Sequence, residues 1–212
     1  MDTLWKVSSD HFAGDRESIM RNGNVYQIAN GYMGYRGTLD EFGAGELVGI
    51  TLAGIYDKVG DAWREPVNAP NGGFTQITLD GIEISALSTP VLRHSQWLNL
   101  EDAVFERETV YRSGGKTLTL RSARFLSADK PNLGIIAFRF TCSENARVTL
   151  RTGIDCRVWD LNGPHLVRLQ SEKNDGILVV HAVTHEASRK VAVAEAVDIT
   201  FGTETHEIRD EK

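Results

Sequence analysis

The sequence predicts an all-β fold, a sandwich of two broad antiparallel sheets with little helix. Polar and apolar residues alternate with a period of two along many short segments, as they do in half-buried strands. These segments recur at intervals of roughly 8–12 residues, and turn residues rather than helical patterns separate them. An immunoglobulin-type sandwich uses about seven to nine strands, fewer than the dozen or so indicated here. We therefore expect two large sheets within a single domain that covers residues 1–212.

The clearest element is a β-hairpin at residues 103–125. Charged and apolar side chains alternate along its first strand, VFERETVY, and Leu118 and Leu120 alternate with polar residues along its second. The glycine-containing turn RSGGK, residues 112–116, joins the two strands. Further strands are expected at residues 47–55, 74–79, 133–142, 146–155, 165–172, 176–184 and 190–200.

Helical patterns are confined to two segments. A short helix is predicted around residues 15–20, with Asp15 placed to cap its amino-terminal end. Residues 187–196 are compatible with either a helix or a strand. The chain has no internal repeat and no low-complexity linker, so helices contribute little to the predicted architecture.

The segment VYQIANGYMGYRGTLDEF, residues 25–42, carries glycines at an even spacing of three. Phosphate-binding loops require GxGxxG or GxxxxGK[ST] at the start of a helix, and neither pattern is present. Asn30-Gly31 between two strand-like runs is instead typical of a tight β-hairpin. We interpret the segment as a sharp turn in which the later glycines permit bulges or a close approach of the backbone.

The same segment places Tyr32, Tyr35 and Arg36 beside the turn. Aromatic faces next to a forked hydrogen-bond donor are suited to a sugar ring or to an acidic partner. The structural alternative is that Arg36 pins the bend by pairing with Asp40 or Glu41. The residue types alone leave both interpretations open.

The histidines do not indicate a metal site. His181 and His185 have a spacing that brings two ligands together on a helix, but the surrounding ILVVHAVTH is strand-like. On a strand, residues four apart lie about 13 Å from each other, too far to share one ion. We interpret His11, His94 and His165 as surface or packing residues. The sequence therefore predicts neither a metal nor another cofactor.

Glycoside chemistry requires two carboxylates roughly 5–10 Å apart on either side of a sugar. A Gly-x-Ser-x-Gly elbow and a supported Cys–His pair are both absent from the sequence. Exposed acids usually serve solvation, and nothing in the sequence pairs the available ones, so no catalytic residue is predicted. The available acids are Asp40-Glu41, Glu101-Asp102, and Asp155 with Asp160.

Composition narrows the class of protein. Hydrophobic residues make up 41% and charged residues 25%, and the net charge of -6 argues against a nucleic-acid partner. No apolar run approaches the roughly 20 residues that a membrane helix needs, and MDTLWKVSSDHF lacks a signal-peptide pattern. Cys142 and Cys156 are interpreted as buried thiols, with a disulfide as the alternative. We therefore expect a cytoplasmic protein without a membrane or nucleic-acid partner.

One set of motifs is similar to those of a known family. NGYMGYRG, residues 30–37, preceded by ESIMRNGNVYQIA and followed by two acids, resembles the start of glycoside hydrolase family 65. That family includes maltose, trehalose, kojibiose and nigerose phosphorylases and acid trehalases. The similarity continues through AGIYD (53–57), PVNAPN (66–71), LNLEDAVFERETVYRSGGKTLTLRSARFLS (98–127) and TGIDCRVWDLNG (152–163).

The resemblance implies that the chain is the N-terminal β super-sandwich of such an enzyme, a galactose-mutarotase-like fold. The catalytic glutamate and the phosphate-binding residues of these enzymes lie in an (α/α)6 barrel, which is absent from this chain. No catalytic residue is carried over, and the chain alone is expected to be inactive. The implied partners are the missing barrel, a second copy in a homodimer, and a glucose disaccharide, with inorganic phosphate as the parent's co-substrate.

The resemblance also implies a loop that reaches the rim of the active site. We assign this role, as a hypothesis, to Tyr32, Tyr35, Arg36 and Asp57, because their chemistry suits a sugar and they lie within the similar motifs.

Two rival functions come from other classes. A stand-alone carbohydrate-binding module would use Trp63 and Trp97 together with the tyrosines. An aldose mutarotase-like enzyme would need a histidine and a carboxylate on one concave face. A hydrogen bond from His94 or His165 to a glutamate in a pocket would favour this second rival, and exposed, scattered histidines would exclude it.

Overall fold

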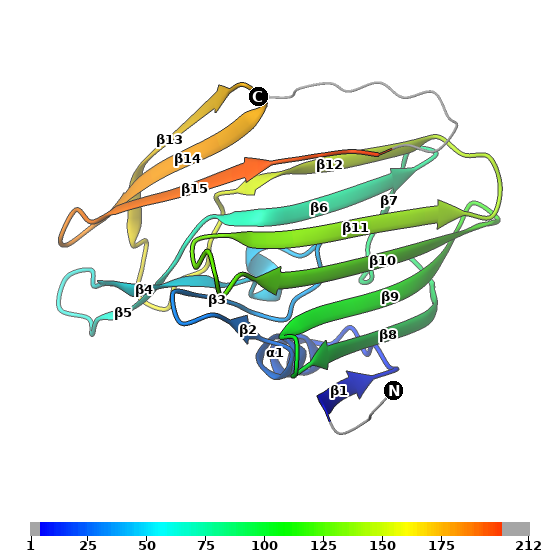
Figure 1. Cartoon of the computed structure of the whole chain (residues 1–212), viewed down its shortest axis with the longest axis horizontal. Helices are drawn as coiled ribbons and strands as arrows, with labels where there is room; N and C mark the ends of the chain where they lie inside the picture. Colours follow the sequence, from blue (N-terminus) through cyan, green and yellow to red (C-terminus); the bar gives the residue numbers. More distant parts are fainter. Residues whose placement is uncertain (1–4, 201–212) are drawn as a thin grey trace.

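The computed structural model describes residues 5–200, which form four antiparallel sheets and one α-helix. The largest sheet has five strands in the order β1-β8-β9-β10-β11, and Figure 1 shows them side by side as one broad layer. Its strands are β1 (Lys6–Ser9), β8 (Val91–Asn99), β9 (Val104–Ser113), β10 (Lys116–Leu126) and β11 (Gly134–Cys142).

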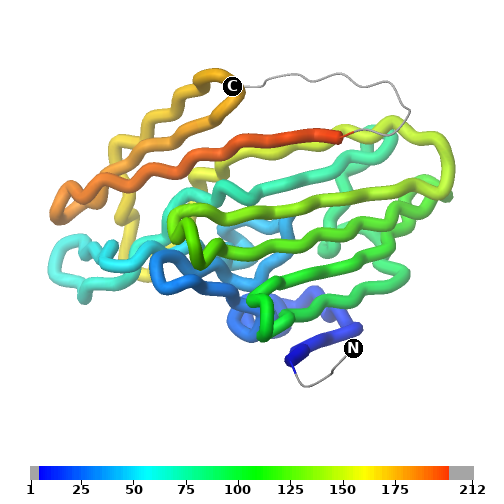
Figure 2. Tube along the Cα trace, in the orientation of Figure 1, coloured from blue at the N-terminus to red at the C-terminus, as the bar shows by residue number. Residues whose placement is uncertain are grey.

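Three smaller sheets complete the fold. Figure 2 follows the chain from the short blue and cyan strands near its start to the long green strands of the five-stranded sheet. One sheet has the order β12-β6-β7, with β6 (Asn71–Leu79), β7 (Ile82–Ile84) and β12 (Val148–Asp155). Another has the order β13-β14-β15, with β13 (Leu166–Asn174), β14 (Ile177–Thr184) and β15 (Lys190–Ala196). The last contains β2 (Ile28–Ala29), β3 (Met33–Tyr35), β4 (Ile50–Asp57) and β5 (Glu65–Asn68) in sequence order.

The main core lies between the five-stranded sheet and the sheet that contains β6. Alternate residues of β6 are buried, including Ile77 and Leu79, and they join one cluster with Phe105, Leu118 and Leu120 of the facing sheet. Burying each of these large apolar side chains contributes about 1.5–3 kcal/mol. The period-two pattern in the sequence therefore reflects this packing of two layers.

A second, smaller core connects β5 to the β13–β15 sheet. Val67 of β5 and the neighbouring Ala69 pack with Leu166, Ala182 and Val191 from the three carboxy-terminal strands. This cluster holds the start of β13 close to β5. The side chains of Asp57, Glu65 and His165 meet at the same place.

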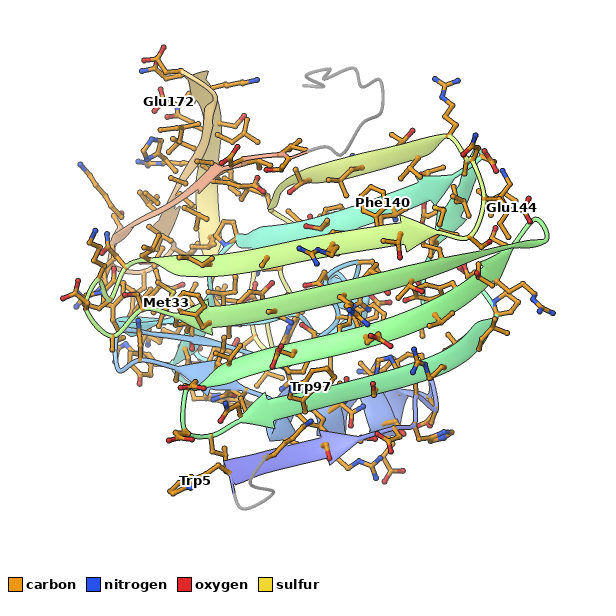
Figure 3. The ribbon with its side chains drawn as sticks, turned by 45° about the vertical axis from the view of Figure 1, so that its right-hand side comes forward. Trp5, Met33, Trp97, Phe140, Glu144 and Glu172 are labelled. Carbon is orange, nitrogen blue, oxygen red and sulfur yellow. The ribbon has the colours of Figure 1, made fainter. Side chains whose placement is uncertain are left out.

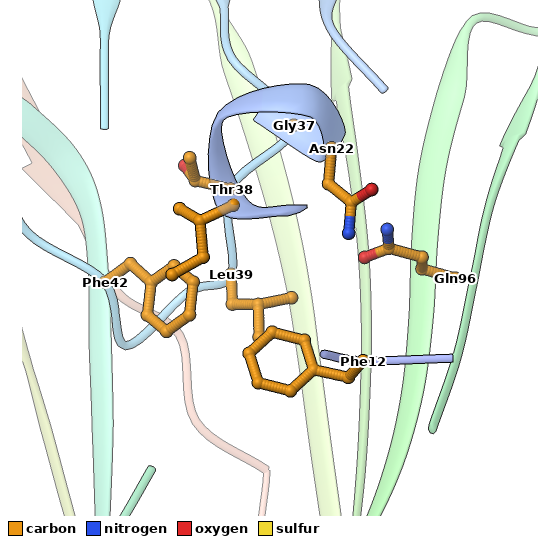
Figure 4. Close-up of a pocket in the computed structure, with 8 residues that line it drawn as sticks. Phe12, Asn22, Gly37, Thr38, Leu39, Phe42 and Gln96 are labelled. Atoms are coloured by element: carbon orange, nitrogen blue, oxygen red, sulfur yellow. The ribbon is translucent and has the colours of Figure 1, made fainter. Parts of the chain in front are cut away.

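Helix α1 (Arg16–Val25) begins where the sequence predicts it. The side chain of Asp15 accepts a hydrogen bond from Ser18 N at 2.9 Å, so the predicted amino-terminal cap is confirmed. The helix continues beyond the predicted residues 15–20 and ends at Val25. Figure 4 shows that its inner side lies over Leu39 and Phe42, whose burial favours the longer helix.

The predicted all-β super-sandwich with little helix is confirmed. The hairpin at 103–125 is β9 and β10, and every other strand that the sequence predicts is present with shifted ends. Residues 187–196, which the sequence leaves ambiguous, contain strand β15. The short β2 and β3 are the two arms of the hairpin predicted around Asn30-Gly31. Strands β1, β5, β7 and β8 have no counterpart among the predicted strands. Within residues 5–200 no helix is long and apolar enough to cross a membrane.

Candidate functional site

The glycine-rich segment forms a tight hairpin, as the sequence predicts. Gly31 has a φ of 87° in the turn between β2 and β3, a region that favours glycine. The Asn30 side chain fixes this turn by donating to the carbonyl oxygens of Ser127 at 2.7 Å and Pro131 at 2.9 Å. The turn is thus anchored to the loop that follows β10.

Gly37 permits a close approach between two backbone segments. A Cβ atom at Gly37 would lie 2.4 Å from Tyr26 Cβ and 2.5 Å from the Tyr26 carbonyl oxygen. The Gly37 N–H also donates to Gly23 O at 2.9 Å, which joins this segment to α1. Steric fit and turn geometry therefore account for Gly31 and Gly37 without a phosphate ligand.

The four residues assigned to a substrate rim occupy different environments. Tyr32 is 42% exposed and Arg36 is half-buried, whereas Tyr35 and Asp57 are 5% and 0% exposed. The Tyr35 hydroxyl donates to Asn71 Oδ1 at 2.7 Å, and burial raises the pKa of Tyr35. Only Tyr32 and Arg36 have surface to offer a ligand in this chain. The rim role of all four stays a prediction.

The expected pairing of Arg36 with Asp40 or Glu41 is wrong. Arg36 donates instead to Asn24 Oδ1 at 2.5 Å and to Met20 O at 3.1 Å, and so binds the end of α1. The geometric reason is that its side chain runs from β3 toward the helix. Arg36 therefore has a structural role, but it holds helix α1 and not the bend at Asp40 and Glu41.

Arg107 is the residue that pairs with both acids. Its guanidinium lies 3.1 Å from Asp40 Oδ2 and 2.7 Å from Glu41 Oε2, and all three side chains are almost fully buried. Burial alone would lower the pKa of Arg107, but Glu41, Tyr111 and Asp40 raise it above its ordinary value. These acids thus neutralise a buried cation and do not serve solvation.

His165 lies at the centre of a second buried charge network. Its Nδ1 is 3.1 Å from Asp57 Oδ2 and its Nε2 is 2.5 Å from Glu65 Oε1, and His165 and Asp57 are 0% exposed. Each ring nitrogen thus faces a carboxylate, an arrangement that favours the protonated ring, in which both nitrogens donate. Burial acts to lower the pKa of His165, but its hydrogen bonds to Glu65 and Asp57 raise it overall.

The two carboxylates of this network are further satisfied by backbone groups. Glu65 Oε1 accepts from Leu161 N and Asn162 N, both at 2.9 Å. Asp57 Oδ1 accepts from Glu186 N at 2.7 Å. Burial acts to raise the pKa of Glu65, but the hydrogen bonds from Asn162 and His165 lower it. The network ties β4, β5 and the loop before β13 together.

A cavity of about 230 Å³ opens beside Glu65, between the β2–β5 sheet and the segment that precedes β13. Asn68 Nδ2 donates to Trp159 O at 2.6 Å and Trp159 Nε1 donates to Val48 O at 2.8 Å, so this segment is fixed over the sheet. A separate cavity under α1, shown in Figure 4, holds only about 10 Å³, too little for any ligand larger than water. The larger cavity is lined by Gln27, Gly34, Arg36, Gly49, Thr51, Glu65, Pro66, Asn68, Trp159, Asp160 and Leu161.

Asp160 gives this cavity an acid with an unusual environment. Burial raises the pKa of Asp160, and the nearby carboxylates of Glu65 and Asp57 raise it further. Its Oδ2 accepts from His165 N at 3.3 Å, and its Oδ1 is buried without a partner among the residues described. Glu65 and Asp160 are thus two acids at one cavity with pKa values shifted in opposite directions.

Glu65, Asp160 and His165 also offer ligand atoms that lie within 4.8 Å of one another, a spacing that a metal ion could use. Glu65 Oε1 and both His165 nitrogens are already hydrogen-bonded, however, and a metal would have to displace the proton from the ring. The hydrogen bonds of Glu65 and His165 therefore account for the positions of these two side chains without an ion.

His94 and Trp97, which the rival functions would use, both make contacts within the fold. His94 is a packing residue, as predicted: burial lowers its pKa to about 4, and its ring contacts Thr109 and Gln96. Figure 3 shows Trp97 on β8 beside β1, where its indole donates to Glu106 and Lys6 lies over its ring. Lys6 thus covers a face of the Trp97 ring on which a sugar would stack.

Sequence reasoning missed the His165 network. Its histidine is 108 residues from Asp57 and 100 residues from Glu65, and no spacing rule links positions so far apart. The only available signal was that AGIYD and DLNGPH each carry an acid or a histidine next to turn residues. That pattern is too common to predict a contact.

Comparisons with known proteins agree with the fold and with the motifs. The family model described as "Glycosyl hydrolase family 65, N-terminal domain" matches residues 11–212. The chain belongs to glycoside hydrolase family 65. It is 34% identical over 201 residues to nigerose phosphorylase of Lachnoclostridium phytofermentans, which covers 92% of this chain and 26% of the relative. It is 26% identical to maltose phosphorylase of Bacillus subtilis, over 94% of this chain and 27% of the relative.

A solved structure confirms the fold of this family 65 domain. A protein described as a kojibiose phosphorylase from the human microbiome superposes with a TM-score of 0.79 at 15% identity, over 89% of this chain and 26% of that one. The chain thus spans about a quarter of the length of the relatives that it matches. It corresponds to their N-terminal domain.

Proposed function

We propose that this chain acts as the accessory N-terminal domain of an α-glucoside phosphorylase whose catalytic residues lie outside these 212 residues. The observation that carries the proposal is the match itself: 92% of this chain aligns with only 26% of nigerose phosphorylase. Two groups of buried charged side chains support it as well. Asp40 and Glu41 pair with Arg107 in the interior, and Asp57 and Glu65 pair with His165.

The proposed docking face is the end of the molecule formed by β2–β5. Exposed apolar side chains gather on its turns and its neighbouring loop, with Tyr32 42%, Tyr56 51%, Trp63 65% and Leu161 70% exposed. Large aromatic residues at such exposure are typical of an interaction surface. In the parent this face would contact the catalytic barrel, and Tyr32 and Arg36 would approach the rim of its active site.

The parent's chemistry is proposed from its relatives. An inverting phosphorylase uses one acid to protonate the glycosidic oxygen while inorganic phosphate attacks the opposite face of the sugar. A glucose disaccharide is the proposed substrate, a homodimer the proposed assembly and the cytoplasm the proposed location. In this scheme the present domain supports the barrel and takes no part in bond cleavage.

A domain exchange tests this function. Residues 11–212 would replace the matching N-terminal quarter of the L. phytofermentans nigerose phosphorylase, and release of glucose 1-phosphate from nigerose and phosphate would be measured. We expect activity from the chimera, and loss of activity or solubility in the relative that lacks any N-terminal domain. Full activity of that truncated relative would contradict an accessory role. Product from this chain alone would place an active site within it.

One observation favours a second function, an aldose mutarotase-like activity. His165 lies within hydrogen-bond distance of Glu65, and Glu65 lines the 230 Å³ cavity. An acid and a base with pKa values shifted apart are what ring opening at the anomeric carbon needs, and Asp160 and Glu65 have these shifts. Polarimetry of freshly dissolved α-D-glucose, which measures the rate of change of its optical rotation, tests this activity. A rate above that of buffer that Asp160→Asn removes would support the activity, and a rate equal to that of buffer would exclude it.

A further inference from the structure

The turn between β4 and β5, residues 58–64, has two opposed acids at its base. Asp57 ends β4, Glu65 begins β5, and the two residues are direct cross-strand partners. Like charges directly opposite each other on a sheet destabilise its pairing. Both carboxylates contact the ring of His165, which is fully buried. One imidazole ring therefore bridges the two ends of the turn.

The same turn is also held from its outer side. Figure 1 shows it beside the turn between β14 and β15. Arg64 donates to the two carboxylate oxygens of Glu186 at 2.8 and 2.5 Å, and the Glu186 N–H donates to Asp57 Oδ1 at 2.7 Å. The side chains of Arg64 and Glu186 reach solvent, so water and salt screen their ion pair. The bridge through His165 is buried and is screened far less.

This bridge depends on the protonation of His165. The protonated ring donates to both carboxylates, whereas the neutral ring has one N–H and turns a lone pair toward the other acid. The charged groups around the ring are Asp57 of β4, Glu65 of β5 and Asp160 of the segment before β13, and the His185 N–H in the β14–β15 turn donates to the His165 carbonyl oxygen. Burial acts to lower the pKa of His165, but these three acids raise it overall.

The turn carries part of the proposed docking face. Trp63 lies within the turn, and Tyr56 comes one residue before Asp57. Both aromatic side chains are more than half exposed. The closed base of the turn therefore fixes the backbone from which these two rings project.

We propose that His165 is a pH switch for this part of the docking face. With its proton, the ring closes the base of the turn and holds Trp63 in place. Without the proton, Asp57 and Glu65 repel each other across the base and the turn opens. Opening of the turn is a property of this chain alone, whereas a loss of docking at high pH rests on the proposed function.

Trypsin provides a local readout of the opening. The peptide bond after Arg64 leads directly into the buried Glu65, so cleavage there requires the base of the turn to open. Cleavage after Lys173, near the turn between β13 and β14, serves as an internal reference, and the ratio of the two rates cancels the pH dependence of the protease. When opening and closing are faster than cleavage, this ratio follows the population of the open turn.

The expected pH profile follows from the position of the proton. We expect the Arg64 to Lys173 ratio of the 212-residue chain to be constant below about pH 6.5, the ordinary pKa of histidine. Above this pH the ratio should rise roughly tenfold per pH unit and level off once the folded-state pKa of His165 is passed. Circular dichroism at each pH would confirm that the chain remains folded.

Asp57→Asn separates the proton from the bridge. Asp57 uses its two oxygens for different partners, since Oδ1 accepts from Glu186 N and Oδ2 contacts His165 Nδ1. Asparagine keeps the first bond with its oxygen and can donate to a neutral ring with its amide nitrogen, so the turn stays closed without the extra proton. We expect a flat ratio in this variant. His185→Gln, at the exposed neighbouring histidine, should retain the wild-type profile.

Three results would overturn the proposal. The first is a wild-type ratio that does not rise with pH. The second is a rise that survives unchanged in Asp57→Asn, which would assign the titration to another group. The third is an equal increase in both cleavages, which would indicate global unfolding. The domain exchange tests docking separately: a flat ratio in a chain that passes the exchange removes the switch alone, and a rising ratio in a chain that fails it removes the accessory role alone.

Discussion

The Nε2 atom of His165 lies 2.5 Å from Glu65 Oε1, across 100 residues of sequence and with the ring fully buried. Asp57 contacts the other ring nitrogen, so one imidazole ring joins the end of β4, the start of β5 and the loop before β13. Glu65 also lines the 230 Å³ cavity. The stability of this end of the fold is therefore coupled to the protonation of His165.

The first prediction is that stability falls as pH rises. The folded-state pKa of His165 is raised above 6.5, so the native protein keeps a proton that the unfolded chain has released. This contribution is fully present below the unfolded pKa and is lost as pH rises through the folded pKa. Urea unfolding between pH 6 and pH 9, in steps of about 0.5 units, measures the slope.

Substitution of the histidine checks this assignment. His165→Gln leaves the buried carboxylates of Asp57 and Glu65 without their cation, with Asp160 nearby, and should lower the free energy of unfolding by about 3–5 kcal/mol near pH 6. It should also flatten the pH dependence, whereas the exposed His185→Gln should change neither quantity. A wild-type slope that survives in His165→Gln would show that another group titrates.

The second prediction concerns Arg107, which is 0% exposed and pairs with Asp40 and Glu41. Arg107→Met retains bulk but leaves two acids buried without a counter-charge, and should destabilise the fold by about 3–5 kcal/mol. Arg93→Met is the control, because Arg93 is 66% exposed and its pair with Glu108 is worth at most about 1 kcal/mol. Equal losses in the two variants would contradict the burial argument.

The third prediction separates the roles of the glycines. Gly37→Ala places a Cβ 2.4 Å from Tyr26 Cβ, where the backbone of both segments blocks relaxation. We expect a loss of about 3 kcal/mol or more in the free energy of unfolding. Gly45→Ala, with open space around its Cβ, should stay within about 0.5 kcal/mol of wild type. Thermal melts followed by circular dichroism would compare them.

The fourth prediction is concentration-dependent dimerisation through the apolar end formed by β2–β5. Trp63 and Tyr56 are 65% and 51% exposed there, and such a surface favours self-association. Sedimentation velocity should detect a monomer–dimer equilibrium that Trp63→Ser weakens. Leu92→Ser, at a 49% exposed position on β8, should leave the equilibrium unchanged. A strictly monomeric wild-type protein at high concentration would contradict this prediction.

Local patterns were sufficient for the elements that depend on neighbours in sequence. The alternation in β9 and β10 predicts their hairpin, Asp15 predicts the start of α1, and Asn30-Gly31 predicts the turn between β2 and β3. Each of these signals acts over a few residues, and a sequence records such distances directly. Strand β5 escaped prediction because two of its three buried residues, Glu65 and Asn68, are polar, so its burial does not follow the alternation of polar and apolar residues.

The sequence by itself determined the all-β class, the turns and, through its motifs, the family. Only the tertiary structure decided which charges meet: Arg107 and not Arg36 pairs with Asp40 and Glu41, and His165 joins Asp57 and Glu65. Such pairs form between residues about 65 to 110 positions apart. A buried charge has no water around it and must pair with an oppositely charged side chain that packing places beside it. Which side chains become neighbours depends on the whole fold.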